Sequence, residues 1–66
     1  MEKKYYAVSW EDRDDNGIEM SKGITVFGGN KEECQQGWNV VRATHTPVFL
    51  RQSSKEEYEM FLSSYN

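Results

Sequence analysis

The oxygen ligands most suggestive of a bound ion lie early in the chain, in a stretch of acidic residues. Asp12, Asp14 and Asn16 stand at alternate positions before a glycine, as in the first half of a calcium-binding loop. The twelfth position of such a loop supplies a bidentate glutamate, but here it is Gly23. Aspartate and asparagine are also favoured in tight turns. The pattern therefore predicts a hairpin turn, and we expect neither a metal nor a cofactor.

Nucleophilic catalysis would depend on Cys34 and His45, the one cysteine and the one histidine of the sequence. On one continuous helix their separation of eleven residues amounts to three turns, about 16 Å. A nucleophile and its base must lie within hydrogen-bond distance, so this pair cannot act together. Ser53 and Ser54 are better explained as helix caps. We expect no catalytic residues and infer that the protein is not an enzyme.

Nucleic acids and phosphates are poor candidates for ligands. Residues 28–30, Gly-Gly-Asn, could offer backbone N–H groups to an anion, but one lysine and two glutamates follow them. Eight basic and eleven acidic side chains give a net charge of −3, with no basic stripe. We keep one alternative function, a small dimeric nucleic-acid-binding regulator that stacks bases on sheet aromatics near Lys22, Arg42 and Arg51.

Two strands that would hold the acidic segment are predicted from the alternation of side chains. Residues 4–10 are rich in aromatic and β-branched side chains, and their even positions form one face: Tyr6, Val8 and Trp10. In residues 18–27 the large apolar side chains also share one parity: Ile18, Met20, Ile24 and Val26. The segment between them has the composition of a turn, so the sequence predicts a β-hairpin.

The length of the hairpin loop decides which side chains share a face. A two-residue turn would send the two apolar sets to opposite sides of the sheet. A three-residue loop, Asp15-Asn16-Gly17, pairs Val8 with Ile24 and brings both sets to one side, with its glycine where φ must be positive. We therefore predict the three-residue loop, and expect Trp10 to lie against the stem of Lys22.

A helix is predicted after the hairpin. Asn30 and Glu33 form a capping box, which indicates a helix from about Lys31 to Ala43. Gly37, on the apolar stripe of this helix, would allow a close approach to the sheet. A second interpretation ends the helix at residue 36 and makes residues 38–43 a strand, giving a four-stranded antiparallel meander with one C-terminal helix. The run Trp-Asn-Val-Val-Arg suits either structure, so both remain open.

A third strand and a second helix complete the chain. Residues 47–51 are strand-like and begin with proline, and Ser54 with Glu57 forms a second capping box. The helix that follows, about 55–65, carries an apolar stripe: Tyr58, Phe61, Leu62 and Tyr65. Together the elements predict a single small α+β domain spanning residues 1–66, in the order ββαβα. A right-handed crossover places the first strand between the other two, antiparallel to both.

The composition limits which class of protein this can be and the cellular compartment in which we expect it. The chain of 66 residues is 36% hydrophobic and contains two Trp, four Tyr and three Phe, too many for a disordered chain. Its apolar runs are too short to span a bilayer, and its single cysteine cannot form an internal disulfide. The first residues lead directly into strand-like sequence, without the apolar core of a signal peptide. We expect a cytoplasmic protein with no membrane segment.

Acidic and aromatic residues left over from the core predict a protein partner. Residues 11–19 hold five acids and one arginine, a net charge of −4, and aromatic side chains are favoured interface anchors. We predict a non-enzymatic protein-binding module of a bacteriophage or mobile-element type, which inhibits or modulates a host protein. The partner-binding residues that we expect are Trp10, Glu11, Asp12, Asp14, Asp15 and Phe49. The large apolar side chains, with Trp38 and the C-terminal stripe, further predict a homodimer.

Overall fold

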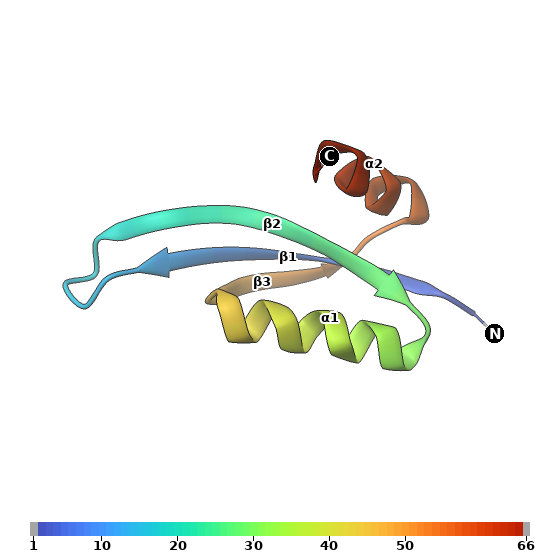
Figure 1. Cartoon of the computed structure of the whole chain (residues 1–66), viewed down its shortest axis with the longest axis horizontal. Coiled ribbons are helices and arrows are strands. Elements are labelled where there is room, and N and C mark those ends of the chain that lie inside the picture. Colours follow the sequence, from blue (N-terminus) through green and yellow to red (C-terminus); the bar gives the residue numbers. More distant parts are fainter. Residues whose placement is uncertain (1, 66) are drawn as a thin grey trace.

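The fold was analysed in a computed structural model, which describes residues 2–65 and, of Tyr65, the backbone only. The elements in chain order are β1 (Lys4–Arg13), β2 (Glu19–Gly29), α1 (Lys31–Thr44), β3 (Pro47–Gln52) and α2 (Lys55–Tyr65) (Figure 1). The strands form one antiparallel sheet in the order β2-β1-β3. This confirms the predicted α+β fold with the order ββαβα. The alternative four-stranded meander is wrong, because α1 continues through residues 38–43 as a helix.

The two helices lie on opposite faces of the sheet, α1 on one side and α2 on the other (Figure 1). β1 and β2 continue beyond α1 and β3 as a two-stranded arm, which ends in the loop at residues 14–18 (Figure 1). The molecule is accordingly elongated, with principal extents of 45 × 23 × 19 Å. No helix in the described part of the chain has the length and apolar character needed to cross a bilayer.

The helix starts are where the sequence predicts them. The Asn30 side chain accepts a hydrogen bond from the Glu33 N–H at 2.8 Å, and the Glu33 carboxylate accepts from the Asn30 N–H at 3.0 Å. This reciprocal pair satisfies backbone donors that the first turn of α1 leaves free. At the start of α2 the Ser54 hydroxyl accepts from the Glu57 N–H at 3.1 Å, and the Ser53 hydroxyl hydrogen-bonds to the Glu57 carboxylate. Both boundaries follow from local hydrogen bonds.

The hairpin loop is the predicted one, but the register beyond it is not. The Asp14 N–H donates to the Ile18 carbonyl at 3.0 Å, and Gly17 has a φ of +80°. Arg13 then pairs with Glu19, whereas Asp12 pairs with Ser21, so Met20 is an extra residue on β2. Such a β-bulge shifts every later pair by one residue.

The bulge overturns the predicted sharing of faces. Val8 is opposite Thr25 instead of Ile24, and Trp10 is opposite Gly23 instead of Lys22. Because opposed residues point to the same side of a sheet, Ile24 lies on the face away from Val8. The expectation that both apolar sets lie on one face, with Trp10 on the stem of Lys22, is therefore wrong.

The main core lies between the sheet and α1. Its centre consists of three buried side chains, Val8, Phe27 and Val41. Four partly buried side chains pack around them: Tyr6, Trp10, Cys34 and Trp38. A Cβ at Gly37 would lie 2.7 Å from Phe27 Cγ, so the helix approaches the sheet as closely as its glycine permits. The predicted role of Gly37 is confirmed.

The α2 side of the sheet has a smaller core. Ala7 and Val26 are paired across β1 and β2, and both are buried. The rings of Tyr5 and Tyr58 lie 5.3 Å apart between their centroids and fix α2 to the start of β1. Arg51 on β3 makes a bidentate ion pair with Glu57, with distances of 2.9 and 2.8 Å. These contacts hold α2 over one end of the sheet.

Candidate functional site

The sheet face that carries α2 is uncovered from its middle toward the arm. The row of residues beyond Ala7 consists of Ile24, Ser9 and Phe49, one from each strand. Ile24 and Phe49 are 52% and 60% exposed, and the neighbouring Val48 is 65% exposed. We call Ser9, Ile24, Val48 and Phe49 the uncovered patch. Three large apolar side chains around one small polar residue make an unusual solvent-facing sheet surface.

The uncovered patch is shallow and has charged residues on its arm side. Ser9, Ile24 and Val48 line a cavity of about 360 Å³ together with Glu11 and Lys22. Glu11 is opposite Lys22 in the register, and its carboxylate also hydrogen-bonds to the Arg13 guanidinium. Lys22 Nζ lies 3.8 Å from Glu19. The patch is therefore apolar at its centre and mixed in charge where it meets the arm.

On its other side the uncovered patch leads to a crevice beneath α2. This crevice has a volume of about 570 Å³, and its lining includes Val26, Met60 and Phe61. The Met60 side chain is 66% exposed. The apolar surface thus continues from the sheet onto one flank of the helix, and α2 forms a wall beside the patch.

The sheet separates the residues predicted to bind a partner. Glu11 and Phe49 belong to the side of the uncovered patch, because Phe49 is opposite Ser9 and Glu11 is two residues further along β1. Trp10 and Asp12 lie on the other side, with α1. Asp14 and Asp15 lie in the loop at the end of the arm. The six residues therefore do not form one continuous surface.

Trp10 is held on the α1 side by three neighbours. Its ring stacks on His45, with 3.6 Å between centroids and an interplanar angle of 10°. Its indole N–H donates a hydrogen bond to Thr25 Oγ1 at 3.0 Å. A Cβ at Gly23 would come within 2.7 Å of the indole, so the glycine makes room for the ring. Trp10 is therefore a packed residue of the fold.

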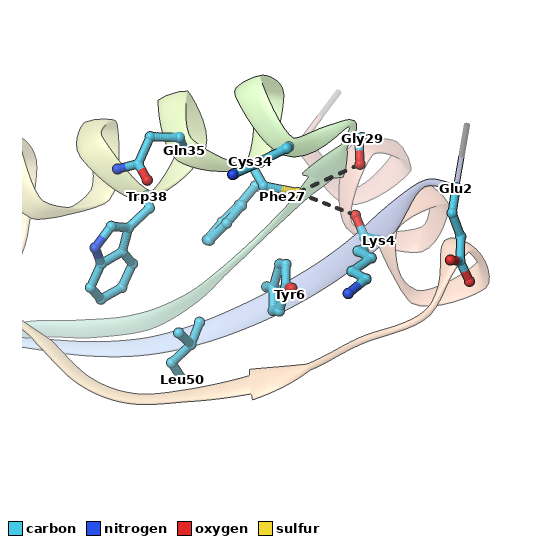
Figure 2. A pocket seen from close by; sticks show the side chains of 10 residues that line it. Glu2, Lys4, Tyr6, Phe27, Gly29, Cys34, Gln35, Trp38 and Leu50 are labelled. Carbon is cyan, nitrogen blue, oxygen red and sulfur yellow. Dashed lines mark hydrogen bonds between the residues drawn. The ribbon is translucent and has the colours of Figure 1, made fainter.

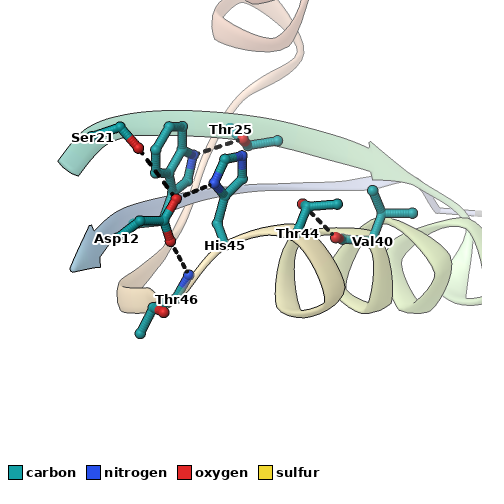
Figure 3. Close-up of polar contacts among 8 residues, drawn as sticks. Asp12, Ser21, Thr25, Val40, Thr44, His45 and Thr46 are labelled. Carbon is teal, nitrogen blue, oxygen red and sulfur yellow. Dashed lines mark hydrogen bonds and ion pairs between the residues drawn. The ribbon is translucent and has the colours of Figure 1, made fainter. Parts of the chain in front are cut away.

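Asp12 joins the arm to the segment between α1 and β3, as Figure 3 shows. Its carboxylate lies 2.6 Å from His45 Nδ1 and accepts from the Thr46 N–H at 2.8 Å and the Ser21 hydroxyl at 3.3 Å. The hydrogen bond to His45, followed by that of Thr46, lowers the pKa of Asp12 below its ordinary value. We call these residues, with Trp10, the Asp12–His45 cluster.

Sequence reasoning missed this cluster because it considered His45 only together with Cys34 on the same helix. Asp12 is thirty-three residues away and reaches His45 only because β1 pairs with β3. Within residues 2–65 no hydroxyl or thiol hydrogen-bonds to the imidazole. The cluster could have been found from the prediction that the first and third strands are neighbours. That pairing places Trp10 opposite Pro47, which is two residues from His45.

The acidic loop is shaped by one of its own carboxylates. Asp14 Oδ1 accepts hydrogen bonds from the N–H groups of Asn16 and Ile18, both at 2.9 Å. Aspartate often stabilises a tight turn in this way. The side chain of Asp15 is exposed. Among the described residues no group of three or more His, Cys, Asp or Glu side chains is placed to hold a metal ion.

Comparison of this chain with protein-family models, with curated proteins and with solved structures finds no match in any of the three. Its function is therefore inferred from its own surfaces. Among these surfaces, the uncovered patch leaves three large apolar side chains in contact with water, although burying such side chains is the main source of stability in a small domain.

Proposed function

We propose that the protein is a non-enzymatic binding module that docks on another protein through the uncovered patch. The observation that carries the proposal is the exposure of Ile24, Val48 and Phe49 around Ser9. Apolar side chains contribute to binding when a partner excludes water from them, and aromatic ones such as Phe are enriched at protein interfaces. Phe49 is the central anchor in this proposal, and the crevice at Met60 extends its contact surface.

The partner is a protein with an apolar ridge and basic residues on the side that meets the arm. Residues 11–19 carry a net charge of −4, and complementary charges at the rim of an interface speed association. In this proposal the protein inhibits or modulates a host protein, is of a bacteriophage or mobile-element type, and acts in the cytoplasm. This role fits a surface that binds without performing chemistry.

The nucleic-acid alternative is less well supported by the placement of the basic residues. Arg51 is paired with Glu57, whereas the Arg42 guanidinium lies 5.9 Å from the Trp38 ring centroid on α1. Lys22 lies near the uncovered patch. Binding of a single strand needs a connected positive groove. A gel-shift assay with an oligonucleotide at low salt tests this alternative, since phosphate binding is strongest there.

Affinity capture with matched variants tests the proposed docking face. Phe49→Glu and Ile24→Glu place a charge in the uncovered patch, whereas Val40→Glu makes the same kind of change on an exposed position of α1. We expect Phe49→Glu and Ile24→Glu to lose proteins that the wild type and Val40→Glu both retain. If the two patch variants retain those proteins, docking through this face is disproved.

A homodimer is a second proposal, supported by a different observation. Leu62 leaves large apolar surface exposed on α2, on a side of the helix nearly opposite Met60 of the crevice, because residues two apart in a helix do not share a face. Pairing of two α2 helices would cover this surface. Light scattering at tens of micromolar, about 10⁻⁵ M, should show a dimer that Leu62→Glu dissociates. A monomer at that concentration would count against it.

A further inference from the structure

A third cavity lies on the opposite side of the sheet, between α1 and β3. Figure 2 shows Trp38 and Cys34 on the helix, Tyr6 on β1 below it, and Leu50 on β3. Phe27 completes the apolar lining. The volume is about 450 Å³, which lies in the range of about 300–1,000 Å³ typical of small-molecule sites. The cavity exists because α1 lies mainly over β2 and leaves the β3 side of this face open.

The charges at this cavity are positive on balance, although the whole chain is acidic. Lys4 and Lys31 line it, together with one acid, Glu2, and the amide of Gln35. Within residues 2–65 neither of the two lysines takes part in an ion pair. The net charge of the chain is −3, so a local excess of positive charge is a distinct feature. An anionic group entering here would meet two available ammonium groups.

The wall between Lys4 and α1 is fixed by the cysteine. The Cys34 thiol donates to the Lys4 carbonyl at 3.5 Å and lies 3.6 Å from the Gly29 carbonyl (Figure 2). These contacts connect the helix to the beginning of β1 and the end of β2. The lysine-bearing end of the cavity is thereby formed before any ligand arrives, which reduces the entropy lost on binding.

We propose that this cavity binds a small organic carboxylate with an apolar acyl or aryl body. The apolar body would contact Tyr6, Trp38 and Leu50, and the carboxylate would lie at the end bearing Lys4 and Lys31. An apolar cavity with a few convergent polar groups orients a ligand through those groups and binds it through its apolar surface. This site is separate from the uncovered patch, which is on the other face of the sheet.

Nuclear magnetic resonance with the full chain and decanoate as the probe tests this site directly. The two tryptophan indole N–H groups give separate resonances, and only Trp38 lines the cavity. We expect decanoate to shift the Trp38 resonance saturably and to leave that of Trp10 in place. Decanol and decyltrimethylammonium, which have the same chain with neutral and positive head groups, should bind roughly tenfold or more weakly.

Charge-reversal variants locate the head group. Lys4→Glu with Lys31→Glu should weaken decanoate binding by roughly tenfold or more, whereas Lys22→Glu with Lys55→Glu makes the same net change away from the cavity and should have little effect. Vesicles containing an anionic lipid distinguish a membrane headgroup from a free carboxylate. The proposal is overturned if decanoate causes no Trp38 shift up to about 1 mM, or if all three head groups bind equally. It is also overturned if the two double variants have equal effects, or if the protein binds only to vesicles.

Discussion

The two faces of the sheet carry similar side chains, but one face buries them and the other leaves them exposed. On the α1 side Phe27 is buried against Gly37, and Trp10 is enclosed by His45, Gly23 and Thr25. On the α2 side Phe49 belongs to the same sheet but is 60% exposed. On the first face these rings are packed into the core, and the cavity beside β3 is the part of it left open. The second face leaves large apolar side chains exposed, and these are the residues that we propose contact a partner.

On β2, the bulge at Met20 sets this difference between the two faces. It places Gly23, Thr25 and Phe27 with Val8 and sends Ile24 to the other side. A strand without the extra residue would have placed Ile24 toward α1. One inserted residue thus decides which aliphatic side chains enter the core and which remain at the surface.

The largest expected difference in stability is between two variants that replace Phe27 and Phe49 by alanine. Phe27→Ala removes a buried ring and should reduce the free energy of unfolding by about 3–5 kcal/mol. Phe49→Ala should change it by no more than about 0.5 kcal/mol while weakening partner capture. Urea denaturation of both variants measures the difference. Similar losses in the two variants would show that the α2 side is part of the core as well.

The Asp12–His45 cluster tests whether polar groups on the α1 side are structural. Asp12→Ala leaves the Thr46 N–H and His45 without their acceptor, so the melting temperature should fall by several degrees. Asp15→Ala, in the same acidic segment, is the matched control and should leave the melting temperature unchanged. Thermal unfolding followed by circular dichroism measures both. Equal melting temperatures would mean that the arm is held by its strand pairing alone.

The loop glycine should have a smaller and purely conformational effect. Gly17 has a φ of +80°, and an added Cβ would meet no atom within 4 Å. Gly17→Ala should therefore destabilise the fold by about 1 kcal/mol through the backbone only. Gly17→Asn should be less harmful, because asparagine adopts this conformation more readily. A neutral Gly17→Ala in urea denaturation would contradict the observed loop geometry.

Acid should loosen the end of the sheet that α2 covers. The hydrogen bonds from Arg51 and then Ser53 lower the pKa of Glu57 from 4.5 to about 2. A lowered pKa in the folded state stabilises the fold above pH 4.5, and this contribution is lost as the pH falls toward 2. The melting temperature of Glu57→Gln should thus fall less over this interval than that of the wild type. Glu56→Gln is the control and should follow the wild type; equal acid sensitivity of Glu57→Gln would refute the linkage.

Local signals in the sequence were sufficient for the elements but not for their register. The two capping boxes involve contacts within four residues, and such contacts can be read from residue types and spacing. The bulge could not be read in this way, since an argument from parity assumes unbroken alternation. Gly23 gave a clue, because a glycine within a strand often makes room for an aromatic ring across from it.

The candidate site depends more than the fold does on contacts between residues distant in sequence. Asp12 and Asp14 were predicted to bind a partner, and the structure adds that their carboxylates accept hydrogen bonds within the chain. Burial and pairing of polar groups depend on residues distant in sequence, which composition does not reveal. Phe49 is exposed, and whether it binds a partner is the question that the capture experiment addresses.

The smallest effect on stability, and the sharpest test of the acidic arm, should come from Asp15. Its side chain is exposed, whereas Asp12 and Asp14 have structural partners, so Asp15→Lys changes the charge without removing a hydrogen bond described for the fold. Once a partner is identified, this variant should slow association several-fold at low salt and leave dissociation and the melting temperature nearly unchanged. The effect should vanish as added salt screens the charges.

Lys55→Glu, which changes charge at the start of α2, is the control for nonspecific attraction. Stopped-flow association rates that do not differ between Asp15→Lys and the wild type at any salt concentration would assign the arm a structural role only, and would leave the uncovered patch as the sole determinant of binding.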